Sequence, residues 1–384
     1  MPPYPDPDAV PDLLGAGVLG PRDVVLILSG PVSAGLPCAR AARAEGGSEA
    51  RIGAHDHARA ATVARAEARG ELVRLRAGVH VERSGWEAVS GRERHLLRIR
   101  ALACASTTPV VIGGASAAAV HALPRIAPWP QLVTLLHVPG RAAARRSGTR
   151  VVRDPAGGRS PLVAAGGGVL LPALAATALA ASHEAAMAAV REAAPRAPGW
   201  FAHGLVALDD ALGASRPSPV TRAGLEAERM LRGPGPWSRR SALLVGAAEG
   251  AAQGPAESVA RGVAAEIGMA RPELDVHVEG HGRVALAWPG DRVGLRIVPP
   301  TPPTPPTPPS VPAAVGRGPS GDPAGWRMVD VTERDVLGPG RLRVLLVHAG
   351  LEPVRRAGLA SGRARSASGV GWPSSGPPLG CAGE

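Results

Sequence analysis

The stretch GELVRLRAGVHVER, residues Gly70–Arg83, decides how the N-terminal half of this chain is interpreted. Apolar and basic residues alternate through Val73–Arg76, a short Ala-Gly break follows, and apolar residues then alternate with a histidine through Val79–Val81. Alternation with period two on both sides of a glycine-containing break predicts a β-hairpin. One face of this hairpin should be apolar, and the other should carry Arg74, Arg76 and His80.

A helix is expected immediately before the hairpin. Residues 57–69 are rich in alanine and contain neither proline nor glycine. Gly70 then suits the position that follows a helix. Arg65 and Arg69 are one turn apart on this helix and share a face. A helix followed at once by a basic hairpin is the order found in winged-helix DNA-binding domains.

Composition excludes several kinds of chemistry. The 384 residues, enough for two or three domains, include 43 basic side chains, and all of them are arginine because the chain has no lysine. It therefore has no Walker A phosphate loop, no Schiff-base lysine and no lysine-dependent nuclease site. Asparagine is also missing, while Ala, Gly, Pro and Arg are abundant. We interpret this pattern as the base composition of a GC-rich genome.

The positive charge is concentrated in one segment. Residues 51–160 contain 18 arginines and 7 acidic residues, a net charge of +11, which equals the formal charge of the whole chain. Clustered arginine is the electrostatic pattern expected for a protein that binds phosphate backbones. A solvated basic surface is the alternative. Our candidates for contact with double-stranded DNA, through its bases or its phosphates, are Arg65, Arg69, Arg74, Arg76 and His80.

We expect an α+β chain divided into several segments. A poorly ordered leader, 1–50, contains one possible strand at 24–28. The winged-helix domain and its extension cover 51–160, a mainly helical connector covers 161–250, and an α/β domain covers 251–350. A Pro-rich linker, 299–325, interrupts that last domain, and a disordered tail covers 351–384.

Local signals place some elements more closely. Ser90 and Glu93 have the spacing of a capping box at the start of a helix. Ser116 is expected to cap a short helix, and Pro172 to occupy the first turn of another. We expect 141–153 to be irregular. A helix beginning at Pro255 should precede three strands, and a further strand should follow the Pro-rich linker.

Six motifs resemble a large group of actinobacterial proteins. These proteins carry an AbiEi-type antitoxin winged-helix domain and end in a domain like the very-short-patch-repair endonucleases. The similarity covers roughly half of the chain. The motifs are GELVRLRAGVHV (70–81), GRERHLLRIRAL (91–102), SAAAVHALP (116–124), PAESVARGVAAEIGMARPEL (255–274), VALAWPGDRVGLRIV (284–298) and GWRMVDVTERDVL (325–337).

The resemblance implies a repressor of its own promoter that acts as the antitoxin of a type IV toxin–antitoxin pair. The toxin would act without direct contact. It also implies a C-terminal unit of the restriction-endonuclease type, in which strand acids and a lysine form a metal site. Glu257 matches the helix acid, but the strand acids fall at Ala285 and at Leu295 or Arg296. Because one carboxylate does not hold Mg²⁺, we expect no metal, no cofactor and no enzymatic activity.

Other features indicate a cytoplasmic protein. The three cysteines are far apart and predict neither a disulfide framework nor a zinc site. The N-terminus is acidic and Pro-rich, unlike a signal peptide. The longest apolar run, 169–181, is too short to span a bilayer. Two alternatives to a DNA-binding regulator remain: a nuclease-fold protein without catalytic activity, and a degenerate protein without function.

Overall fold

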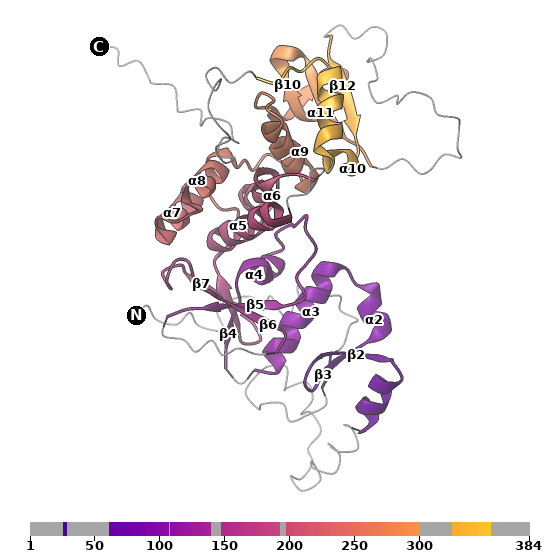
Figure 1. Cartoon of the computed structure of the whole chain (residues 1–384), viewed down its shortest axis with the longest axis vertical. Helices are drawn as coiled ribbons and strands as arrows, with labels where there is room; N and C mark the ends of the chain where they lie inside the picture. Colours follow the sequence, from indigo (N-terminus) through magenta and orange to yellow (C-terminus); the bar gives the residue numbers. More distant parts are fainter. Residues whose placement is uncertain are drawn as a thin grey trace. The chain divides into compact units, whose positions relative to one another are not determined.

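The computed structural model describes residues 61–106, 108–139, 147–192, 197–299 and 325–354, together with the backbone strand of 26–28. The described residues form a mixed α+β structure with several small sheets (Figure 1). The chain divides into two compact units. Unit 1 is Met1–Leu123 with Ala127–Ala180, and unit 2 is Pro124–Ile126 with Ala181–Glu384.

The predicted hairpin is present in unit 1. Residues 61–68 are helical, and Gly70 follows the helix with a positive φ of 76°. Strand β2 (Leu72–Arg76) pairs antiparallel with β3 (Val79–Glu82). Strand β1 (Leu26–Leu28) pairs with the other edge of β3, so β3 is the central strand of three. The strand expected at 24–28 is therefore confirmed over residues 26–28.

Two helices follow the hairpin, α2 (Arg83–Ala88) and α3 (Gly91–Cys104). The capping box at the start of α3 is confirmed, because the Ser90 side chain accepts from the Glu93 N–H and the Glu93 carboxylate accepts from the Ser90 N–H. A winged helix also needs helices before the hairpin, and the described residues include only 61–68 there.

Two further sheets complete unit 1. Strand β4 (Val110–Val111) pairs in parallel with β8 (Val169–Pro172), and β8 pairs antiparallel with β7 (Leu162–Gly166). Strand β5 (Val133–His137) pairs in parallel with β6 (Thr149–Arg153). The core beneath them gathers side chains from these strands, from α3 and from the short helix α4 (Gly114–Val120).

Three local expectations in unit 1 are wrong. Helix α4 (Gly114–Val120) begins after Gly113, and Ser116 lies inside it, where its hydroxyl contacts His95 and Thr134. Pro172 ends β8 instead of opening the next helix. Part of the segment expected to be irregular forms β6, because the parallel partner β5 supplies its backbone hydrogen bonds. These outcomes depend on residues that are distant in sequence.

The main segment of unit 2 begins within helix α5 (Leu174–Glu192). Strand β8, which pairs with β4, belongs to unit 1. Four more helices follow: α6 (Trp200–Leu212), α7 (Arg222–Arg232), α8 (Ser238–Ala247) and α9 (Pro255–Glu266). Pro255 occupies the first turn of α9 as expected.

A four-stranded mixed sheet forms the C-terminal part of unit 2. Strands β9 (Glu273–Val278), β10 (Gly282–Trp288) and β11 (Val293–Ile297) are antiparallel neighbours, and β12 (Arg327–Val331) pairs in parallel with β11. Helices α10 (Glu333–Val336) and α11 (Pro339–His348) follow β12.

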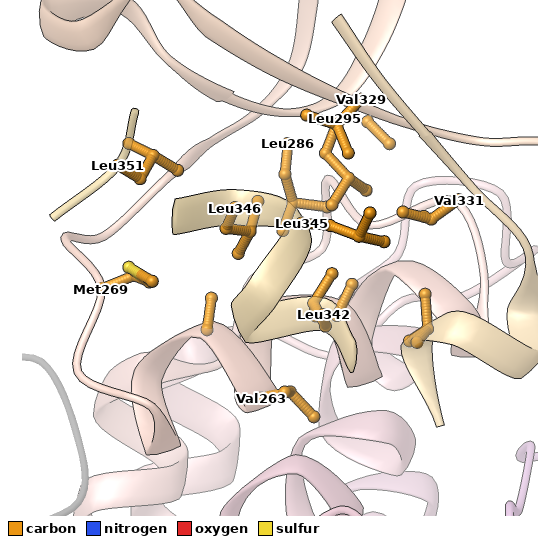
Figure 2. Close-up of a cluster of buried hydrophobic side chains, with 14 of the residues drawn as sticks. Val263, Met269, Leu286, Leu295, Val329, Val331, Leu342, Leu345, Leu346 and Leu351 are labelled. Carbon is orange, nitrogen blue, oxygen red and sulfur yellow. The ribbon is translucent and has the colours of Figure 1, made fainter. Parts of the chain in front are cut away.

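The core of this part lies between the sheet and its helices. Side chains of α9 and α11 and of the inner strands point toward one another in Figure 2, among them Val263, Leu295 and Leu346, which are fully buried. The longer apolar side chains of Leu and Val supply most of this burial, as expected for a chain with few aromatic residues.

The leader apart from β1, the Pro-rich repeat and the tail after residue 354 lie outside the described residues. The expectations of a disordered leader, linker and tail concern those segments. Among the residues that the structure describes, none forms a helix with the length and apolar character that crossing a bilayer requires.

Candidate nucleic-acid interface

The five predicted contact residues all lie in or beside the hairpin of unit 1. Arg65 is exposed on helix 61–68 and, among the described residues, donates only to groups of its own helix, the Ala61 carbonyl and the Thr62 hydroxyl, both at 3.3 Å. Arg74 is exposed on β2. Within the described residues, Arg65 and Arg74 form no ion pair.

Arg69 is engaged by an acidic neighbour. Its Nε and Nη2 donate to the two carboxylate oxygens of Glu71 at 2.6 and 2.9 Å. This hydrogen bond and the opposite charge raise the pKa of Arg69, and the same hydrogen bond lowers the pKa of Glu71. A phosphate would have to displace the carboxylate, so Arg69 is a poorer phosphate ligand than the sequence indicated.

His80 is buried instead of exposed. Its side chain is 4% exposed, and its Nε2 lies 3.2 Å from a carboxylate oxygen of Glu67 on the preceding helix. The alternating pattern missed this because it cannot show that Glu67, from the preceding helix, lies against the face of β3 that carries His80. His80 is therefore positioned to hold the helix against the sheet.

A register shift also separates the two hairpin arginines. Arg74 lies opposite His80, but a bulge follows, and Arg76 lies opposite Val79. Cross-strand partners share a face and successive residues alternate. The two arginines thus belong to rows on opposite faces of the hairpin. The structure does not gather the five candidates on one surface.

A different basic cluster in unit 1 was missed by the sequence analysis. The guanidinium carbons of Arg94 and Arg98, on α3, lie 5.7 and 4.8 Å from the ring centroid of Trp86 on α2. Both arginines are partly buried. Their spacing of four residues was a usable signal, because it places both side chains on one helix face. The indole that joins them was not predictable, because it comes from another helix.

The position implied for a metal site has the wrong chemistry for a cation. Glu257, in the first turn of α9, accepts from Arg283 at 2.9 Å, and Arg283 also pairs with Asp275 at 2.6 Å. The Arg283 guanidinium is therefore paired with the Glu257 carboxylate, which a metal ion would need as a ligand. Ala285 and Leu295, at the strand positions, are buried in the core. The described ranges contain no group of three or more His, Cys, Asp or Glu side chains that could hold a metal.

Comparison of the chain with protein families, with curated proteins and with solved structures found no match.

Proposed function

We propose that this chain is a double-stranded DNA-binding regulator that uses the basic surface of unit 1. As the resemblance to AbiEi-type antitoxins implies, its target would be its own promoter. The proposal includes a winged-helix arrangement around β2 and β3 and a protein without enzymatic activity. A cognate toxin would be neutralised without direct contact.

The main support for the proposal is the location of the positive charge in the chain. The segment 51–160 accounts for the entire formal excess of +11. Within its described part, Arg65, Arg74, Arg94 and Arg98 have no carboxylate partner. Unpaired arginines attract phosphate backbones and supply most of the affinity for nucleic acid that does not depend on sequence.

A gel-shift titration with fragments of the chain's own genome tests the proposal. We expect salt-sensitive binding of duplex DNA and weaker binding by the variant Arg65→Ala/Arg74→Ala. Arg239→Ala/Arg343→Ala is the matched control, because both arginines are exposed in unit 2, on α8 and α11, and the variant removes the same two charges. Absence of duplex binding, or equal affinity of the double variant and the wild-type protein at low salt, contradicts the proposal.

A second proposal concerns unit 2, which we take to be a nuclease-type fold without catalysis. It is supported by the helix α9, the three antiparallel strands and the parallel fourth strand. The Arg283 ion pair with Glu257 supports the loss of metal chemistry. Incubation with supercoiled plasmid and Mg²⁺ or Mn²⁺ should leave the plasmid intact. Metal-dependent cleavage that purifies with the protein would contradict this.

The alternative of a degenerate protein without function has a direct test. A folded protein with the cores described above should unfold cooperatively. A sloping circular dichroism melt without a transition would favour the degenerate alternative.

A further inference from the structure

The cluster formed by Trp86, Arg94 and Arg98 contains two positive charges. The contacts that the cluster makes within the fold do not account for both of them. Arg94 donates to the Trp86 and Glu87 carbonyls at 2.8 and 2.9 Å and so binds the C-terminal end of α2. Arg98 lies over the indole and donates through Nη2 to the side chain of Gln131. Neither contact gives Arg98 a negative partner.

The acidic residues nearest in sequence are engaged elsewhere. Glu87 pairs with Arg83 at 3.5 Å, and the Glu93 carboxylate accepts from the Ser90 N–H at 2.7 Å in the capping box. The cluster therefore contains two like charges within one helical turn and no carboxylate contact in the described residues. Burial, followed by the charge of Arg94, lowers the pKa of Arg98. This direction shows that the surroundings disfavour its positive charge.

An arginine on an aromatic face is well placed to receive an anion. Stacking fixes the plane of the guanidinium and leaves its N–H edge open, and the fork of donors matches two oxygens of a phosphate. Of the five N–H donors of Arg98, one, on Nη2, donates to another described residue, Gln131. An anion would also relieve the repulsion between the two guanidinium groups.

We propose that Arg98, held on Trp86 beside Arg94, is a phosphate-binding site that contacts the backbone of nucleic acid. The nucleic-acid part of this inference rests on the proposed function of unit 1, because free polyphosphate would present the same chemistry. Gln131, which is exposed at the edge of the cluster, is positioned to orient the Arg98 guanidinium. Arg98 would fix the position of unit 1 on the duplex without reading its sequence.

The first experiment measures duplex affinity by fluorescence anisotropy with a labelled 20-base-pair DNA. Arg98→Gln should weaken binding about tenfold at low salt, as expected for one lost charge-assisted hydrogen-bonded contact. It should also reduce the salt slope by about one. Arg98→Lys keeps the charge but loses the planar fork, and we expect intermediate affinity. Arg343→Ala, in unit 2, is the control and should bind as the wild-type protein does.

The second experiment uses the wild-type protein and, together with the first, separates the sources of phosphate. The wild-type protein is treated with phenylglyoxal, and modified arginines are identified by mass spectrometry. Tripolyphosphate should protect Arg98 and leave Arg343 unprotected. Protection of Arg98 by tripolyphosphate combined with unchanged duplex affinity of Arg98→Gln overturns the nucleic-acid assignment. Equal modification of Arg98 with and without tripolyphosphate overturns the phosphate site itself.

These outcomes remain distinct from those of the proposed function. If the wild-type protein binds no duplex, the regulator proposal fails, while protection by tripolyphosphate still decides the Arg98 site. If Arg65→Ala/Arg74→Ala weakens duplex binding but a normally folded Arg98→Gln does not, only the Arg98 assignment fails. The melting curve of Arg98→Gln establishes that this variant is folded.

Discussion

Asp209 and Arg261 are both fully buried in unit 2, and two hydrogen bonds of 2.6 Å join Arg261 Nη2 to the two carboxylate oxygens of Asp209. Each of the two side chains also forms a further hydrogen bond with the backbone. Arg261 also donates to the Ala247 carbonyl at 2.6 Å, and Asp209 accepts from the Glu249 N–H at 2.9 Å. Burial of either charge alone would be costly, so the pair belongs to the fold of unit 2 and is not available to a ligand.

Arg261→Met should destabilise the protein by about 3–5 kcal/mol, because it leaves the Asp209 carboxylate buried without its partner. The double variant Asp209→Leu/Arg261→Met should recover much of this loss. Urea denaturation of the four proteins in the cycle measures the coupling. Arg296→Met is the matched control: Arg296 pairs with Asp330 on the surface at 2.7 Å, and its loss should cost at most about 1 kcal/mol. Equal losses for Arg261→Met and Arg296→Met would contradict the role assigned to the buried pair.

Elements with a strong local signal were predictable from the sequence. The apolar runs of β10 and β11, the proline at the start of α9 and the capping box of α3 each indicated the element that forms. Elements that depend on distant partners were not. Strand β6 needs β5, and the interior position of Ser116 in α4 depends on His95 and Thr134. Local patterns do not contain these contacts.

Helix α10 has a capping box that makes its stability depend on pH. Thr332 donates through its N–H and hydroxyl to Asp335 Oδ2, at 2.9 and 2.7 Å, and Arg341 pairs with the same carboxylate. Burial alone would raise the pKa of Asp335. The hydrogen bonds from Thr332 and the charges of Arg341 and Arg334 outweigh it, and the pKa is lowered from its ordinary 3.8. The stabilisation is fully present above that value and is lost as pH falls through the lower folded-state pKa.

Asp335→Asn should therefore lower the free energy of unfolding at pH 7 by about 1 kcal/mol and make stability less sensitive to pH as the pH falls below 3.8. Urea denaturation across this range gives both quantities. Glu333→Gln is the control, since Glu333 is exposed in the same first turn, and it should retain the wild-type pH dependence. An Asp335→Asn variant with the wild-type dependence on pH would contradict the depressed pKa.

For the protein as a whole, the sequence alone located the basic segment 51–160 but did not show which of its arginines are available to bind phosphate. The excess of positive charge over 51–160 follows from counting charged residues in the sequence, which needs no structure. Which arginines remain unpaired depends on contacts between elements. Glu71 engages Arg69, a bulge turns Arg76 away from Arg74, and Trp86 brings Arg94 and Arg98 together.

The salt dependence of duplex binding distinguishes a local surface from a general attraction to the net charge. If Arg65, Arg74, Arg94 and Arg98 each contact one phosphate, a plot of log K against log salt should have a slope of about −3 to −4. Engagement of the full formal charge of +11 would instead give a slope of about −10. Anisotropy titrations from 50 to 300 mM NaCl, about a sixfold range, provide the measurement. A slope near zero would remove the electrostatic basis of the proposal. A slope near −10 would show that duplex binding does not depend on a defined set of arginines.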